Sequence, residues 1–298
     1  MSDTALDVAV ASFASDVGDC DPVTISGLAT RGGPVAGVRS VTAPAGVEWI
    51  EPAEMTLRCG AGTAVADVDA ALREVGQCVG VPETGTIGGA LSVGRSGIRR
   101  LGWGPVRDSV LQVRYVSAAG DVVKAGGPTV KNVSGFDLCR LLVGSWGTLG
   151  FLADVILRTR PLPVGERWFV SRRDPWELLG ELYRPTSMLW NGETTWVLLD
   201  GHVDDLAGQV RRSGLAETDD RPTLPPHRWS MSPAELPSLQ ASDDGGFVAE
   251  IGVGIVHRCE PAPPRRHDPA MVELHRRIKH QFDPGGRLNP GIDVLSIT

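Results

Sequence analysis

Glycines are concentrated in residues 126–150 (GGPTVKNVSGFDLCRLLVGSWGTLG), where six of them fall within 25 positions. An apolar run separates the segments KNVSGFD (131–137) and GSWGTLG (144–150). Glycine adopts positive φ and lets the backbone approach a neighbour closely, and successive N–H groups in such turns can form a concave anion-binding surface. A pair of turns between strands would also use glycine in this way. The segment therefore predicts either tight turns or a backbone that wraps a flat or anionic group.

Two further glycine clusters precede this segment, at residues 27–33 (GLATRGG) and 85–89 (GTIGG). Each cluster adjoins a predicted strand, so three loops can converge on one elongated ligand. FAD is such a ligand, because its diphosphate needs several backbone N–H donors and its ring systems need close main-chain contacts. The chain lacks the G-x-G-x-x-G fingerprint of dinucleotide-binding folds and the G-x-x-x-x-G-K-[ST] phosphate loop. Both of these common nucleotide-binding alternatives are therefore excluded.

The motifs resemble those of the vanillyl-alcohol oxidase / p-cresol methylhydroxylase (PCMH-type) family of FAD proteins, and within it those of the FAD-binding subunits of bacterial glycolate oxidases. The family patterns K-N-V-x-G-[FY]-D and G-S-x-G-T-L-G match residues 131–137 and 144–150. Its T-[IL]-G-G core matches residues 86–89, and its ending F-D-P-x-x-x-x-N-P-G matches residues 282–291. The first loop, GLATRGG, holds fewer glycines than is usual in the family, and residues 166–245 match no motif.

The resemblance implies an α+β fold with a PCMH-type FAD-binding domain of two α+β subdomains. We expect this domain at residues 1–163, a short cap domain at 164–246, and a C-terminal strand, helix and tail at 247–298 that pack back on the FAD-binding domain. In this family the cap supplies substrate contacts, and about 80 residues is short for a full substrate lid.

The resemblance also implies which residues hold the cofactor. The first loop would wrap the diphosphate, the second would contact the diphosphate and the flavin, and Asn289 would lie near the flavin. The implied contacts are Ser26, Gly27, Leu28, Ala29, Thr30, Arg31, Gly32, Pro82, Gly85, Thr86, Ile87, Gly88, Gly89, Ser92, Asp108, Lys131, Asn132, Gly135, Asp137, Gly144, Ser145, Gly147, Thr148, Leu149 and Asn289. Some family members attach FAD through a histidine in or near the first loop. No histidine precedes His202, so we expect non-covalent FAD.

A bound flavin would accept the electrons, but oxidation of a 2-hydroxy acid also needs a cation for the carboxylate and a base for the hydroxyl proton. Related D-2-hydroxy-acid dehydrogenases carry a histidine-rich metal motif, of which only His257 remains here, after Glu250 and the segment IGVGIV. His257 is thus the one weak candidate for a catalytic residue, and a lone histidine at a strand end is more commonly solvated or satisfied by a neighbour. We expect no metal site, and the remaining catalytic residues are unknown.

Composition limits the choice of partner and compartment. The formal net charge of −7 argues against nucleic acid or an anionic membrane as the main partner. Five scattered cysteines without a C-x-x-C pair argue against a zinc site or an iron–sulfur cluster in this chain, and they favour reduced thiols in the cytoplasm. No apolar run approaches the length of a membrane span. A cytoplasmic location is expected, with attachment to the inner membrane only through partners.

We therefore expect an FAD-dependent oxidoreductase subunit for glycolate or D-lactate. The resemblance implies a larger flavin subunit and an iron–sulfur subunit as partners in a glycolate oxidase-like complex. Two alternatives stay open: a stand-alone flavin oxidase or dehydrogenase for another alcohol, and a non-catalytic flavin-fold scaffold.

Local patterns predict several elements directly. Helical spacing of apolar residues predicts helices at 3–17, at 63–75 with Thr63 as N-cap, and after Asp268-Pro269. Strands are predicted at 22–26, 40–43, 55–59, 110–116, 149–159 and 247–256, and a hairpin turn at 119–121. Arg107 and Asp108 are expected to pair and hold a turn.

Overall fold

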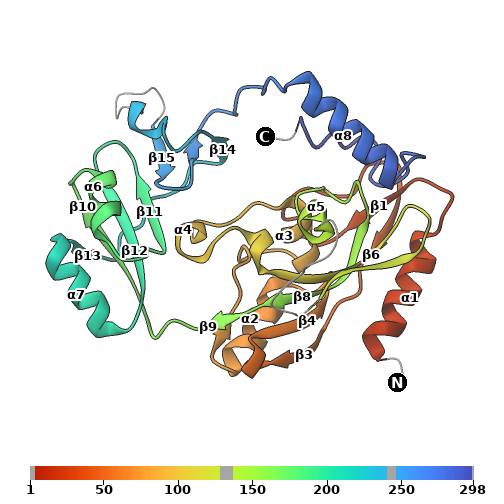
Figure 1. Ribbon diagram of the computed structural model, residues 1–298, viewed down its shortest axis with the longest axis horizontal. Coiled ribbons are helices and arrows are strands. Elements are labelled where there is room, and N and C mark those ends of the chain that lie inside the picture. The colour runs from red at the N-terminus through yellow and green to blue at the C-terminus, as the bar shows by residue number, and fades with distance from the viewer. Residues whose placement is uncertain (1–3, 128–136, 240–245, 297–298) are drawn as a thin grey trace. The chain divides into compact units, whose positions relative to one another are not determined.

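The computed structural model describes residues 4–127, 137–239 and 246–296, and the chain divides into two units. Unit 1 combines Met1–Gly97, Pro105–Leu162 and Arg266–Ile297. Unit 2 combines Ile98–Gly104 with Pro163–Arg265. The helices and strands of both units carry their labels in Figure 1.

An antiparallel five-stranded sheet forms the centre of unit 1, in the order β3 (Val47–Glu51), β4 (Thr56–Gly60), β8 (Phe151–Arg158), β6 (Val110–Val116) and β7 (Val122–Gly126). The middle strand, β8, is buried along all but its last residue. Its apolar side chains therefore meet packing on both faces of the sheet. The helix α2 (Val65–Glu74) lies beside β3 in Figure 1.

Shorter elements complete unit 1 around this sheet. β1 (Val23–Ser26) pairs in parallel with β2 (Arg39–Thr42), and β5 (Gln77–Cys78) pairs with β9 (Arg160–Pro161). The remaining elements are the helices α1 (Ala5–Val17), α3 (Ile87–Val93), α5 (Leu138–Leu142) and α8 (Pro269–Phe282), with the 3-10 turns η1 (Pro52–Glu54) and η2 (Val106–Ser109).

The helix α1 follows its sequence pattern closely. Leu6, Val10, Phe13 and Val17 are buried in the main core of unit 1, as their helical spacing predicts. Thr4 closes a capping box with Asp7, which satisfies backbone N–H groups at the helix start. The helix predicted at 3–17 is thus confirmed over Ala5–Val17. The last helix is also confirmed at its start, because the Asp268 side chain accepts from the Ala270 N–H ahead of Pro269.

One prediction about unit 1 was wrong. Thr63 does not cap α2: the cap position is Ala64, and the Thr63 hydroxyl instead donates to the carbonyl oxygen of Gly60, 2.6 Å away. The glycine-rich residues 85–104 contain α3, in unit 1, and the short α4 (Arg100–Trp103), in unit 2. Thr86 caps α3 by accepting from the Gly89 N–H.

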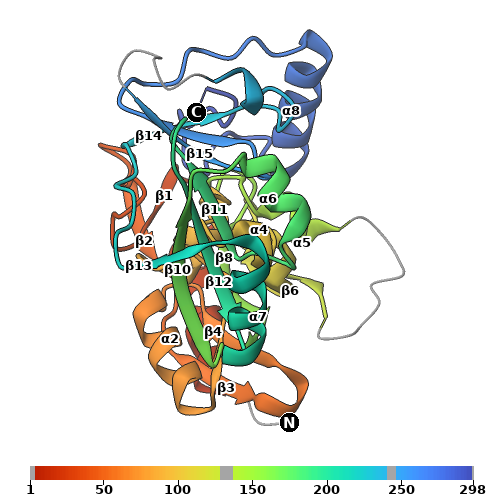
Figure 2. The same ribbon diagram turned by 90° about the vertical axis from the view of Figure 1, so that its left-hand side faces the viewer.

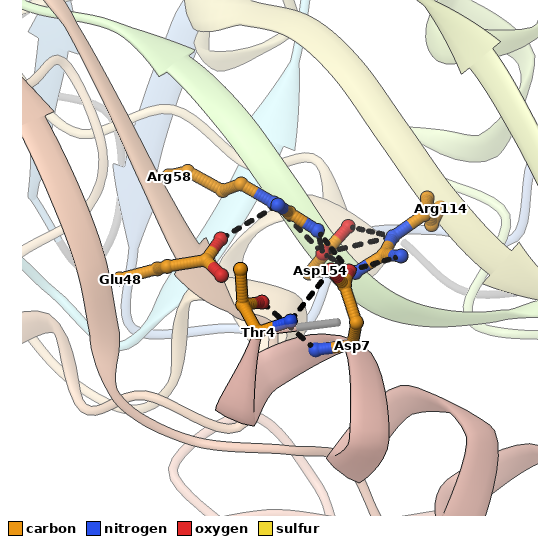
Figure 3. Close-up of polar contacts among 6 residues, drawn as sticks. All are labelled: Thr4, Asp7, Glu48, Arg58, Arg114 and Asp154. Atoms are coloured by element: carbon orange, nitrogen blue, oxygen red, sulfur yellow. Dashed lines mark hydrogen bonds and ion pairs between the residues drawn. The ribbon is translucent and has the colours of Figure 1, made fainter. Parts of the chain in front are cut away.

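A buried cluster of charges joins α1 to the sheet. Asp154, fully buried on β8, accepts hydrogen bonds from Arg58 on β4 and Arg114 on β6 (Figure 3). Both arginines also pair with Asp7 of α1, at 3.0 and 2.7 Å, and Arg58 pairs with Glu48 at 2.6 Å. The hydrogen bond from Arg58 and those with Thr4 hold the pKa of Asp7 well below its ordinary value. The cluster therefore fixes the start of α1 by charge as well as by packing.

Unit 2 is built on a seven-stranded sheet in the order β13 (Ala216–Thr218), β10 (Gly165–Ser171), β12 (Thr195–Gly201), β11 (Ser187–Trp190), β15 (Phe247–Glu250), β16 (Ile255–Arg258) and β14 (His227–Ser230). Figure 2 shows β10, β12 and β11 side by side. The helices α6 (Pro175–Glu181) and α7 (Val203–Ser213) and the turn η3 (Leu236–Ser238) pack apolar side chains on one face of this sheet. The region without recognisable motifs is therefore a folded α+β unit.

The single strand predicted at 247–256 is wrong, because the segment forms the hairpin β15–β16. Gly252 and Gly254 adopt positive φ (77° and 84°) and turn the chain between the two strands. β15 pairs with β11, so this segment lies in the sheet of unit 2. The strand expected to return to the FAD-binding domain thus belongs to the other unit, and only α8 and the residues after it lie in unit 1.

No helix among the described residues is both long and apolar enough to cross a membrane.

Candidate functional site

A cavity of about 360 Å³ opens in unit 1. Its wall is formed by the end of β1 and the loop after it, by the residues between β4 and α2, by α3, and by single residues of later segments. The lining residues are Thr24, Ile25, Ser26, Gly27, Leu28, Ala29, Thr30, Arg31, Gly32, Gly33, Val35, Ala43, Ala61, Gly62, Thr86, Gly88, Gly89, Ser92, Val93, Trp146, Phe151, Leu152, Asn289 and Ile292. Segments far apart in the sequence thus surround one space of the size that holds small molecules.

Glycines let the first two loops pack against one another beside this cavity. A Cβ atom on Gly85 would lie 2.2 Å from the Thr30 hydroxyl oxygen and 2.5 Å from Nη1 of Arg31. On Gly88 it would lie 2.8 Å from the Ala61 carbonyl oxygen. Gly85 also has φ of 80°, which side chains rarely tolerate. The glycines of the second loop are therefore required by contact with neighbouring backbone and with the first loop.

Of the described residues that line the cavity, Arg31 alone is charged. Its guanidinium donates to the Thr30 hydroxyl at 3.4 Å, and no carboxylate of the described residues pairs with it. Burial lowers the pKa of Arg31 below its ordinary value. A half-buried cation without a counter-charge is costly, so the site suits an anionic ligand group next to Arg31. With its glycine-rich walls, the cavity fits a nucleotide with a diphosphate.

The structure brings together twelve of the residues predicted from the sequence. Ser26, Gly27, Leu28, Ala29, Thr30, Arg31, Gly32, Thr86, Gly88, Gly89, Ser92 and Asn289 all line the cavity. Pro82, Gly85 and Ile87 of the second loop do not line it, and Ile87 is buried in the core instead. Gly85 supports the wall indirectly, through its contact with Thr30 and Arg31.

Most of the described residues of the third glycine segment do not line the cavity. Among them Trp146, which the sequence did not single out, lines it, whereas Gly144, Ser145, Gly147, Thr148 and Leu149 do not. The Ser145 and Thr148 hydroxyls donate to carbonyl oxygens within their own segment, at 2.8 and 2.7 Å. These residues shape the turn that carries Trp146, which has a left-handed φ of 54°.

The other predicted contacts of this segment lie elsewhere. Lys131, Asn132 and Gly135 fall outside the described residues. Asp137 caps α5 by accepting from the Arg140 N–H. Asp108 is exposed and pairs with Arg140 at 3.4 Å and with Arg107 at 3.9 Å. The expected pairing of Arg107 and Asp108 is present as a loose surface contact, and neither aspartate lines the cavity.

The part of the cavity wall between β4 and α2 was not predicted from the sequence. Ala61 and Gly62 line the cavity, and the signal for them was the short pair Gly60 and Gly62. A Cβ atom on Gly60 would lie 2.3 Å from the Pro44 carbonyl oxygen, and on Gly62 it would lie 2.2 Å from that of Ala43. Both glycines therefore allow the residues after β2 to pass close to the chain at this wall.

His257 lies in unit 2, where it is buried on β16. Its Nε2 lies 2.9 Å from the Glu250 carboxylate on the neighbouring strand β15, and Nη2 of Arg228 lies 3.8 Å from the same oxygen. Nε2 of His257 thus has a hydrogen-bond partner in the carboxylate of Glu250. Among the described residues, no group of three or more His, Cys, Asp or Glu side chains is arranged to hold a metal ion.

Comparisons with known proteins point to FAD-linked oxidases. Residues 38–126 match the family of FAD-binding domains, and residues 235–292 match the C-terminal domain of FAD-linked oxidases. The chain is 28% identical to the glycolate oxidase subunit GlcE of Escherichia coli, over 92% of this chain and 93% of that protein.

Other matches are shorter or more distant. The glycolate oxidase subunit GlcD of Bacillus subtilis is 44% identical over 26% of this chain, and the D-lactate dehydrogenase of Archaeoglobus fulgidus is 40% identical over 35%. These matches span 17% and 24% of those two proteins. A solved alkyldihydroxyacetonephosphate synthase has the same fold, with a TM-score of 0.66 at 14% identity over 94% of this chain and 73% of the synthase.

Proposed function

We propose that this chain is the FAD-binding subunit of an oxidoreductase for a small 2-hydroxy acid. The premise is that it belongs to the PCMH-type family of FAD-linked oxidases and uses FAD as its cofactor. The observation that carries the proposal is the match to a glycolate oxidase subunit over nearly the whole of both chains. Glycolate and D-lactate, named by the relatives, are both small 2-hydroxy acids. They are therefore the proposed substrates.

The cavity in unit 1 is the proposed FAD site. We assign the loop from Ser26 to Gly32 and the guanidinium of Arg31 to the diphosphate, because Arg31 is the one charge that the described residues place on the wall. Thr86, Gly88, Gly89, Ser92 and Asn289 complete the assigned wall. Bound FAD would supply the two-electron acceptor, and these residues would bind and orient it. No histidine lies in the first loop, which supports non-covalent binding.

Unit 2 is the proposed cap. It is a folded sheet with its own apolar cores, so it can serve as a contact surface for substrate or for another subunit. A larger flavin subunit and an iron–sulfur subunit are the proposed partners, because this chain has no cysteine-ligated cluster motif to pass electrons onward. A cytoplasmic location belongs to the same proposal.

A specific observation favours a second candidate, a flavin-fold subunit that is not itself catalytic. The one weak candidate base, His257, is buried and held by Glu250 at 2.9 Å. As a base it could use only Nδ1, on a side chain that is 10% exposed. Under this second reading the chain would hold FAD and support a partner that oxidises the substrate.

The visible spectrum of the purified chain tests these readings. We expect flavin absorption that survives desalting, and bleaching when glycolate or D-lactate is added without oxygen, with ethanol as the non-acid control. Bleaching that requires co-purified partner subunits would support the subunit reading, and bleaching by ethanol alone would support a stand-alone alcohol oxidase. Failure to bind FAD after reconstitution would refute the cofactor site.

A further inference from the structure

The side chain of Asn289 joins three separate parts of the cavity wall. Its Oδ1 accepts from the Thr24 hydroxyl at 2.9 Å and from the Ile25 N–H at 3.1 Å, both at the end of β1. Its Nδ2 donates to the carbonyl oxygen of Trp146, 2.7 Å away, in the third glycine segment. The Thr24 hydroxyl also accepts from the Val35 N–H at 3.0 Å, where the first loop returns. One amide therefore connects both ends of the first loop to Trp146.

The hydrogen-bond capacity of this amide is largely used within the protein. A carboxamide oxygen has two lone pairs, and both accept from the end of β1. Asn289 is 7% exposed, so these bonds are shielded from water. Its oxygen is thus unavailable to a ligand, although the residue lines the cavity.

The backbone around this amide is under strain at two positions. Asn289 and Trp146 are both non-glycine residues with left-handed φ, at 45° and 54°. Such conformations persist where surrounding contacts determine them, and they cluster at functional sites. Between them, Gly147 leaves the space that Nδ2 of Asn289 occupies, because a Cβ atom there would lie 2.8 Å from it.

The segment that carries Asn289 is anchored from behind. The Asn289 N–H donates to the Val23 carbonyl oxygen at 2.9 Å. Lys279 on α8 donates to the Thr148 carbonyl oxygen at 2.7 Å and pairs with Asp283, whose carboxylate accepts from the backbone N–H groups of Arg287 and Leu288. These bonds hold the residues after α8 against both β1 and the third glycine segment.

We infer that Asn289 is a positioning residue, which sets the first loop and Trp146 at a fixed separation before FAD arrives. FAD affinity then depends on this amide even though its oxygen is committed to the protein. The inference rests on the proposed cofactor site. A chain that binds no FAD would refute the site, whereas a chain whose FAD affinity ignores the amide would refute only the positioning role.

Two pairs of variants test the inference. Asn289→Asp keeps the acceptors for Thr24 and Ile25 but removes the donor to Trp146. The matched control, Asn191→Asp, makes the same change in a turn of unit 2, where the Asn191 oxygen only accepts from the Glu193 and Thr194 N–H groups. Thr24→Val removes the hydroxyl that Asn289 and Val35 share, and Thr24→Ser restores it.

The readouts are the FAD dissociation constant, the visible circular dichroism of bound flavin, and the melting temperature of the apoprotein. We expect Asn289→Asp and Thr24→Val to weaken FAD binding at least about tenfold, the equivalent of one buried hydrogen bond, at temperatures where each apoprotein is fully folded. We expect both to alter the flavin dichroism. Thr24→Ser and Asn191→Asp should bind FAD within about twofold of the parent.

Unchanged FAD affinity in folded Asn289→Asp and Thr24→Val would overturn the inference. Equal loss of affinity in Thr24→Ser and Thr24→Val would also overturn it, since the hydroxyl would then be irrelevant. If Asn289→Asp does not fold, the comparison of Thr24→Val with Thr24→Ser decides the question alone.

Discussion

Removing one charge from the buried cluster of Figure 3 should destabilise unit 1 strongly. Asp154 is 0% exposed, and its Oδ2 accepts from Nε and Nη2 of Arg58 at 3.1 and 2.6 Å and from Arg114. In Asp154→Asn an amide replaces the carboxylate. This amide can place its own N–H₂ group, a donor, toward the guanidinium donors of the two arginines. The two arginines then face one another with Asp7 and Glu48 as their remaining counter-charges.

The expected cost follows from this geometry. Neutralising one partner of a buried ion pair costs about 3–5 kcal/mol, and the lower end applies here because Asp7 and Glu48 still pair with the arginines. Unit 1 contains roughly 190 residues, and a domain of this size loses about 2–4 °C in Tm per kcal/mol. We therefore expect Asp154→Asn to lower the Tm of unit 1 by about 10 °C.

Thermal unfolding followed by circular dichroism, with urea unfolding as a second measure, checks this value. Asp121→Asn is the matched control, because Asp121 is exposed in the hairpin between β6 and β7. A loss below about 1 kcal/mol in Asp154→Asn would contradict the reasoning, since a contribution of that size is typical of surface pairs.

Three further predictions concern the cofactor site and the charge cluster. Gly147→Leu should abolish FAD binding while far-UV circular dichroism stays unchanged, because its side chain would meet Nδ2 of Asn289 and the Phe151 ring at a φ of 68°; retained FAD would show that this turn does not shape the site. Arg31→Met should weaken FAD far more than riboflavin, which lacks the diphosphate, and an equal loss for both ligands would argue against the assigned contact. Asp7 has a pKa held below its ordinary value of 3.8, mainly by Arg58, so its contribution is complete at neutral pH and is lost as pH falls below about 4. The stability difference between the parent and Asp7→Asn, measured by urea unfolding, should therefore shrink as pH drops from 5 to 2, and a difference that grows would contradict this sign.

Sequence reasoning succeeded where the signal was local. The stripe of α1 and the Asp268 cap of α8 depend on residues within one or two turns, and the structure confirms both. The structure also brings the first loop and Thr86, Gly88 and Gly89 of the second loop to one cavity. FAD as the cofactor is supported by the family matches.

Predictions failed where distant contacts decide the outcome. Thr63 has a good capping side chain, but the Gly60 carbonyl oxygen takes its hydroxyl. Residues 247–256 read as one apolar strand because both strands of the hairpin are buried, and only the positive φ of Gly252 and Gly254 separates them. Trp146 could not be identified from its own segment, since its place on the wall depends on Asn289, 143 positions later.

The order of segments in unit 1 has a consequence for how the protein is made. The hydrogen bond between Thr24 and Asn289 spans 265 positions, and residues 163–265 of unit 2 are synthesised between the two. Contacts of such separation form late, because the intervening chain must first be restrained. During synthesis the first glycine loop therefore lacks its contacts with the segment of Asn289 while unit 2 folds. A ribosome-bound chain halted before residue 266 would carry all three glycine segments and still lack a finished cofactor site, so loading with FAD becomes a check that synthesis has passed through both units.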